Sequence, residues 1–200
     1  MNFIESLDEK LFLFLNGSYV SWLDYPMILI TGTLIWIPLY LFLLYAVIRA
    51  RRSTFWITLF CLILLVVLTD QGSGVFKHLV ARPRPCYDPS TSSLVRLLTG
   101  CGGQYGFFSA HASNCFGVAT FMFLFFQRKL IPALMLFFWA LLVSYSRIYV
   151  GKHFPGDILV GMIFGIMSGW IIYRLELWFQ MVRQWGSLVR FRHLYPNTPL

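Results

Sequence analysis

The chain has 200 residues, of which 58% are hydrophobic and only 12% are charged, and its mean hydropathy is +0.69. This composition excludes an ordinary soluble domain and predicts one all-α, membrane-embedded domain over residues 1–200. The formal net charge is +8, but the cations lie mostly at the ends of apolar runs, as membrane topology requires, so we expect no nucleic-acid partner.

The chain begins with a short amphipathic segment. Over residues 2–15, apolar side chains recur at helical spacing among three acids, which predicts a helix lying in the membrane interface. The segment lacks the basic start and continuous apolar core of a secretory signal peptide, so we expect it to stay in the mature protein.

Five apolar runs follow, each long enough to cross roughly 30 Å of hydrocarbon. They cover residues 25–48, 55 to about 80, 110–126, 131–150 and 158 to about 178. We therefore expect a polytopic bundle of about five transmembrane helices. Residues 82–108 form the longest polar break, and residues 179–200 are expected to form a basic cytoplasmic tail.

Basic residues between and after the runs predict the orientation. They are Arg49, Arg51, Arg52, Arg128, Lys129, Arg174, Arg183, Arg190 and Arg192. The positive-inside rule places all of them in the cytoplasm. The N-terminal helix, the 82–108 loop and the 149–156 turn then face outward, on the periplasmic side of a bacterial inner membrane.

Three short polar segments stand at the outward ends of these runs. They contain, in chain order, Lys77 with Arg84-Pro85, Ser109-Ala110-His111, and Ser146-Arg147 followed by His153 and Asp157. Ionisable groups are costly in or beside a bilayer and usually functional. Taken singly, each also has a structural explanation, as a cation reaching for headgroups or an acid capping a helix. Cations beside histidines predict one shared catalytic site for a phosphate group.

These segments resemble the motifs of the type 2 phosphatidic acid phosphatase superfamily in order and spacing. The first and third match fully, whereas the second has Phe108 in place of proline and Ala110 in place of glycine. The resemblance implies a bacterial membrane lipid phosphatase in which His153 is the nucleophile, Asp157 orients its ring and His111 transfers protons.

Phosphate binding is expected from the cations and from the turn before the third run. The expected groups are Lys77, Arg84, Arg147, the Ser109 hydroxyl and the backbone near Ala110. The histidines and carboxylates are also potential metal ligands, but the cations would repel a divalent ion, so we expect no metal or other cofactor. Vanadate, which haloperoxidases with this motif set bind, is the remaining alternative.

The substrate is expected to be a lipid phosphate that enters from the surrounding membrane lipids. The resemblance points to undecaprenyl pyrophosphate, lipid A, phosphatidylglycerophosphate or phosphatidic acid, of which the first two are favoured for an outward-facing site. A lipid phosphotransferase with the same site is one alternative. A lipid-phosphate binder or transporter without catalysis is another.

Two further features of the runs carry predictions. Gly161, Gly165 and Gly169 form a small-residue stripe, which predicts close packing against a site helix, with a homodimer face as the alternative. Asp70 lies inside the second run and is expected to contact Lys77 or a neighbouring helix rather than to catalyse.

The outer loop contains two cysteines and several aromatic residues. Cys86 and Cys101 are expected either to form a disulfide or to remain free thiols, and the sequence leaves both open. Tyr105, Phe107, Phe108 and Tyr149 are expected to line the approach of the lipid headgroup, although aromatic residues are common at membrane interfaces.

Overall fold

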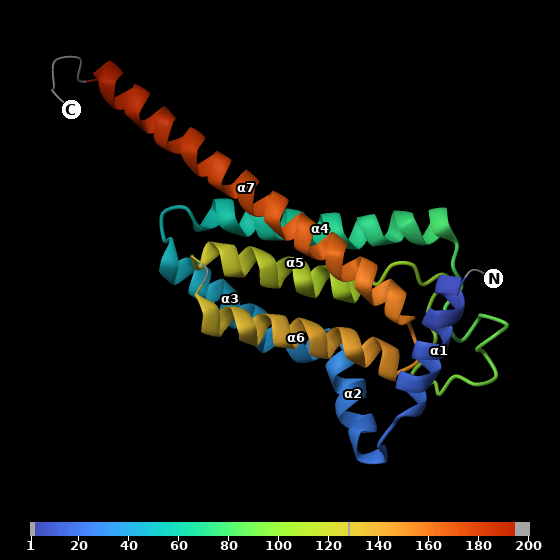
Figure 1. Cartoon of the computed structure of the whole chain (residues 1–200). Helices are drawn as coiled ribbons and strands as arrows, with labels where there is room; N and C mark the ends of the chain where they lie inside the picture. The colour runs from blue at the N-terminus through green and yellow to red at the C-terminus, as the bar shows by residue number, and fades with distance from the viewer. Residues whose placement is uncertain (1–2, 128, 195–200) are drawn as a thin grey trace.

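The computed structural model describes residues 3–127 and 129–194, with side chains up to residue 185 (Figure 1). Within these residues the regular structure is helical, as expected from the composition. The longer helices are α1 (Phe3–Gly17), α2 (Asp24–Thr31), α3 (Ile37–Ala50), α4 (Phe55–Val80), α5 (Ala110–Phe125), α6 (Leu130–Tyr149) and α7 (Pro155–Leu194). Two short 3-10 helices, η1 (Ser21–Leu23) and η2 (Leu34–Trp36), flank α2.

Residues 25–48 were predicted to form one spanning helix, and the structure shows a bent pair of helices there instead. The chain breaks between α2 and η2, and the path of the helix bends there by 73°. Gly32 is extended there, with ψ 144°, and the indole of Trp36 donates a hydrogen bond of 2.9 Å to the carbonyl of Ile30 across the bend. Hydropathy does not register such a break because the side chains on both sides are equally apolar.

The structure has fewer unambiguous membrane crossings than the five predicted. Among the described residues, α4, α6 and residues Pro155–Trp185 of α7 are long and apolar enough to span, and the bent α2–α3 pair makes a fourth if it crosses once. The remaining run forms α5, whose 16 residues are about 24 Å long and thus shorter than the hydrocarbon core. The chain is a multi-pass membrane protein.

Helix α5 lies at the centre of the bundle and contacts α4, α6 and α7. Its buried side chains, such as Phe116 and Phe121, join those of Leu65 on α4 and Val143 on α6 in the main apolar core. The outward faces of α4, α6 and α7 expose large apolar side chains, which suits contact with lipid rather than water.

The glycine stripe of α7 packs against α5, which confirms the preferred prediction. A Cβ atom at any of the three positions would collide with a backbone carbonyl of the α5 segment, and the three carbonyls belong to Ser109, Ser113 and Gly117. The stripe is therefore covered by α5 and does not offer a face to a second copy of the chain.

The helix ends that carry the three polar segments lie together. The end of α4, the start of α5, the end of α6 and the start of α7 meet at the end of the bundle that α1 and the 82–108 loop cover (Figure 1). The α3–α4 connection, which contains Arg51 and Arg52, lies at the opposite end. Helix α7 continues to Leu194, beyond its expected end near residue 178, so residues 179–194 prolong the helix. Arg128 and the side chains of Arg190 and Arg192 lie outside the described residues.

Candidate active site

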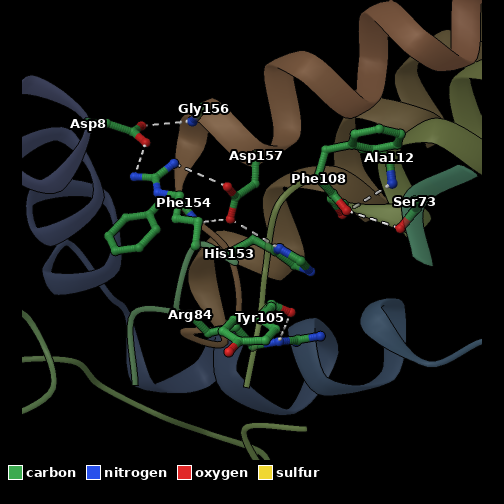
Figure 2. A network of polar contacts seen from close by, with 12 residues as sticks. Asp8, Ser73, Arg84, Tyr105, Phe108, Ala112, His153, Phe154, Gly156 and Asp157 are labelled. Carbon is green, nitrogen blue, oxygen red and sulfur yellow. Dashed lines mark hydrogen bonds and ion pairs between the residues drawn. The ribbon is translucent and has the colours of Figure 1, made fainter. Parts of the chain in front are cut away.

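The centre of the site is a buried pair formed by His153 and Asp157 (Figure 2). His153 lies in the turn between α6 and α7, and Asp157 lies in the first turn of α7. The Nδ1 atom of His153 is 3.3 Å from Oδ2 of Asp157, and the side chains are 2% and 0% exposed. The same carboxylate oxygen accepts a hydrogen bond of 3.1 Å from the backbone N–H of Phe154. The carboxylate thus favours the tautomer with a proton on Nδ1, which leaves the lone pair on Nε2.

The surroundings of His153 keep its ring neutral. Burial lowers the pKa of His153 to about 4, against the opposing effect of the Asp157 carboxylate, and the charges of Arg147 and Arg84 lower it further. At neutral pH the Nε2 atom therefore carries a free lone pair. Any positive charge that the ring gains during a reaction would be stabilised by Asp157.

Two buried guanidinium groups, those of Arg84 and Arg147, lie close enough to His153 to act on it through their charges. Arg84 donates hydrogen bonds to the carbonyls of Tyr105 and Cys101 at 3.3 and 3.2 Å, and Arg147 donates one of 2.7 Å to the Thr31 hydroxyl. The buried Nε atom of Arg147 has no hydrogen-bond partner in the part of the chain that the structure describes.

Lys77, half-buried near the end of α4, adds a third positive charge. It interacts electrostatically with Arg84, Arg147 and Asp157. Three neighbouring cations around one carboxylate carry excess positive charge in a poorly solvated place. Such a cluster, with an unpaired guanidinium donor, fits a bound oxyanion such as phosphate.

His111 occupies the first turn of α5 and is close enough to Lys77, Arg147 and His153 to interact with their charges. Ser109, just before it, is the N-cap of α5, where its hydroxyl accepts a hydrogen bond of 3.4 Å from the N–H of Ala112. Its own N–H donates to the Asp157 carbonyl at 3.1 Å. Ser109 therefore joins α5 to α7, and Ala110 is the first residue of α5. Their phosphate contacts stay predictions.

Phe108, the residue that replaces proline in the second motif, is fixed by packing. Its ring is 1% exposed and lies against Phe76 and Phe164, with centroid distances of 5.5 and 4.8 Å. Its carbonyl accepts a hydrogen bond of 3.1 Å from the Ser73 hydroxyl (Figure 2). The expectation that Phe108 lines the headgroup approach is therefore wrong. It is also wrong for Tyr149, which is 1% exposed.

Sequence reasoning missed several polar residues around the site. Arg82 donates to the second oxygen of Asp157 at 3.1 Å and to Asp8 on α1 at 2.7 Å. Its position directly before Pro83 and the Arg84-Pro85 pair was the available signal. Asp8 and Thr31 gave no comparable signal, because both are far in sequence from the residues that they contact.

Lys152 was also missed, although it lies next to His153 in the third motif. Burial and the charges of Arg147 and Arg84 lower the pKa of Lys152, so it belongs to the same cluster of cations. Asp70, by contrast, is exposed on α4 and acts on Lys77 only through its charge among the interactions of the described residues.

The outer loop is held around Arg84. Cys86 and Cys101 form a disulfide with Cα atoms 6.4 Å apart, a separation within the usual range. Gly102 follows with φ +81° and lies against the Arg84 guanidinium, a backbone conformation that favours glycine. No group of three or more histidine, cysteine or acidic side chains that would hold a metal ion occurs among the described residues.

Comparison with known proteins shows the family. The model of the PAP2 superfamily matches residues 54–181. The chain belongs to the PAP2 superfamily. It is therefore a membrane lipid phosphatase, a hydrolase that acts on lipid phosphoesters. Helices α1 to α3 precede the matched residues, so Asp8 and Thr31 lie outside the region that defines the family.

Similar proteins include two named lipid A 4'-phosphatase. The relative from Bacteroides thetaiotaomicron is 35% identical, over 86% of this chain and 78% of its own. The relative from Porphyromonas gingivalis is 33% identical, over 89% and 76%. The crystal structure of Aquifex aeolicus LpxE has a TM-score of 0.65 and 28% identity, and covers 82% of this chain and 93% of that one.

Proposed function

We propose that this protein removes a phosphate group from lipid A, through a covalent phosphohistidine on His153. Two relatives named for the 4'-phosphate of lipid A, at 35% and 33% identity, support the choice of substrate. The buried His153–Asp157 pair facing Arg84 and Arg147 carries the proposed mechanism.

In the first step, Nε2 of His153 attacks the phosphorus atom and the bond from phosphorus to the ester oxygen breaks. Lys77, Arg84 and Arg147 neutralise the phosphoryl oxygens, whose charge would otherwise repel the nucleophile. Asp157 stabilises the positive charge on the ring, and His111 donates a proton to the departing oxygen. Protonated His111 is the starting form that this step requires.

In the second step, water attacks the phosphohistidine. His111, now neutral, takes a proton from the water, the bond between phosphorus and nitrogen breaks, and inorganic phosphate leaves. His153 returns to its neutral form. No metal ion takes part in either step.

The site is proposed to face the periplasm of a bacterial inner membrane. The α3–α4 connection, which contains Arg51 and Arg52, lies at the opposite end of the bundle from the α6–α7 turn (Figure 1), which supports a cytoplasmic location for that end. We infer five crossings within one domain of residues 1–200, with the α2–α3 pair and the short α5 each counted as one. Helix α1 then lies on the outer surface, and residues 179–200 extend into the cytoplasm.

Phosphate release by the purified protein tests this proposal. The protein in detergent, with a metal chelator, receives lipid A, undecaprenyl pyrophosphate, phosphatidylglycerophosphate or phosphatidic acid, and mass spectrometry identifies the dephosphorylated product. We expect release from lipid A at the 4' position and none from His153→Ala. Asp88→Asn, in the outer loop, is the control variant. Cys86→Ser in the same loop is not suited, because it breaks the disulfide.

The other outcomes identify the alternatives. Release from none of the four lipids contradicts the phosphatase, and release only when a second lipid supplies an acceptor hydroxyl identifies a phosphotransferase. Binding without release, unchanged in His153→Ala, identifies a lipid-phosphate binder. Loss of activity with the chelator contradicts the metal-free mechanism.

A further inference from the structure

We infer that Asp8 on α1 and Arg82 are positioning residues that hold Asp157 against His153, so that α1 is part of the catalytic unit. This inference rests on the proposed function, because it assigns a task to the surroundings of the proposed nucleophile. Neither residue was expected from the sequence, and Asp8 precedes the residues that match the family.

The contacts form a continuous path from α1 to the histidine. Asp8 accepts hydrogen bonds of 2.7 Å from Arg82 and, through its other oxygen, 2.7 Å from the backbone N–H of Gly156. Arg82 donates its second bond, of 3.1 Å, to Asp157. Figure 2 shows Asp8 reaching Gly156 while Asp157 reaches Phe154 and His153. The guanidinium of Arg82 also lies over the Phe154 ring, 4.2 Å from its centroid.

Each carboxylate oxygen of Asp157 therefore has its own role. One faces Nδ1 of His153 and the N–H of Phe154, and the other faces Arg82. A fully buried carboxylate needs a cation or several donors to stay ionised. Arg82 supplies that cation without facing the phosphate, because its two bonds are directed to Asp157 and Asp8. Asp8 in turn fixes the direction of the guanidinium fork.

One face of helix α1 contacts the α6–α7 turn, which contains His153. Asp8, Phe12 and Asn16 are spaced four residues apart and thus share this face. The ring of Phe12 packs edge-on against Phe154, with centroids 5.2 Å apart, and the Asn16 amide donates to the Ile148 and Tyr149 carbonyls at 3.2 and 3.0 Å. The residues just before and just after the α6–α7 turn are thereby held by α1.

Helix α1 also carries a row of exposed apolar side chains beside the face that contacts the turn. Its large exposed side chains are Phe3, Ile4, Leu7, Leu11 and Phe14. A helix of this kind inserts its apolar face into the membrane interface. The position of α1 on the membrane is thus linked, through Asp8 and Arg82, to the geometry of His153.

The pH dependence of catalysis separates positioning from simple stabilisation. The charged and titratable groups around the His153–Asp157 pair are Arg82, Asp8 on α1, Arg84, Lys77 on α4, His111 on α5, Arg147 on α6 and Lys152. Removal of one cation from this set makes protonation of the pair easier, and removal of one anion makes it harder. Opposite shifts are therefore expected for Arg82 and Asp8.

The experiment measures phosphate release from lipid A by the full-length protein in detergent, as a function of pH. We expect Asp8→Asn and Arg82→Lys to lower kcat by about tenfold, and Arg82→Ala by about a hundredfold, with KM changed by less than about threefold. The acid limb of kcat is expected to move to higher pH in Arg82→Ala and to lower pH in Asp8→Asn. Glu9→Gln, which removes the neighbouring acid of α1, is the matched control and should match the unmodified protein.

Each result decides the inference. Full activity of Asp8→Asn and Arg82→Lys beside an active unmodified protein overturns it and leaves the proposed function intact. Lower kcat in Arg82→Ala and Asp8→Asn without a shift of the acid limb in either variant overturns it in favour of a merely structural role. If Arg82→Ala fails to fold, Arg82→Lys and Asp8→Asn still decide. If the unmodified protein releases no phosphate from lipid A or the three other lipids, the proposed function fails, and the inference falls with it.

Discussion

Substitution of Asp157 by asparagine removes the negative charge beside the proposed nucleophile with little change of shape. At the 3.3 Å that separates Asp157 from His153, a full charge pair is worth about 5 kcal/mol at an effective dielectric constant of about 20. This interaction is made only when the ring becomes positively charged during phosphoryl transfer. Its loss is therefore expected to slow that step by about 10³- to 10⁴-fold.

The assay is single-turnover phosphate release by Asp157→Asn at saturating lipid. The binding cations are left in place, so we expect KM to change far less than kcat. Asp88→Asn is the control, because Asp88 is an outer-loop acid that bonds to Ser90 and takes no part in the site. A decrease of less than tenfold in Asp157→Asn would refute the reasoning that the carboxylate stabilises a charged histidine.

Four further predictions concern the His153 ring, the packing of α7 against α5 and the outer loop. Because burial lowers the pKa of His153 to about 4, NMR of ¹³C-labelled histidine should show it neutral down to about pH 5, and titration near 6.5, as for an exposed histidine, would contradict this. An unfolded histidine takes up its proton near pH 6.5. The contribution of His153 to stability should therefore be lost as pH falls from about 6.5 to about 4. In thermal unfolding, the stability of His153→Gln should then depend less on pH than that of the unmodified protein. Gly161→Ala places a Cβ atom 2.7 Å from an α5-segment carbonyl and should lower the unfolding temperature, whereas Gly74→Ala, with nothing within 4 Å, should raise it slightly; equal effects would count against the packing account. Replacing Cys86 and Cys101 with serine should destabilise the protein by up to about 3 kcal/mol and lower phosphate release, as measured by thermal unfolding and the lipid assay, and an unchanged unfolding temperature would argue against the bond.

Local spacing explains why the contact between His153 and Asp157 could be predicted from the sequence. His153 and Asp157 are four residues apart at the start of a helix, so their contact depends on one turn of backbone. The ends of the apolar runs likewise indicated that Lys77, His111 and Arg147 lie at one depth. These inferences need only helix geometry and the cost of charge in a bilayer.

Contacts between distant segments could not be predicted in this way. Thr31 binds Arg147 from 116 residues away, and Asp8 binds Arg82 from 74 residues away. Both pairings depend on where α1 and α2 pack against the bundle. Hydropathy patterns identify a membrane segment but do not say which polar side chain it presents to a neighbour.

The bend at Gly32 and the role of Phe108 in the second motif could not be predicted from the sequence either. The bend at Gly32 interrupts a run whose apolar character is continuous, so composition predicts a single helix there. Phe108 in place of proline left the second motif open, until the structure showed its ring between α4 and α7 and its carbonyl bonded to Ser73. A large apolar residue thus fixes the turn by packing.

Direct detection of the phosphohistidine tests the central claim. His111 serves both the formation and the hydrolysis of the proposed intermediate, so the unmodified protein is mixed with lipid A and quenched within its first turnover. Quenching in alkali, followed by peptide mass spectrometry, should find one phosphoryl group on His153, and none in the His153→Ala variant. Phosphate release without any phosphorylated histidine, or a phosphoryl group on another residue, would contradict the account.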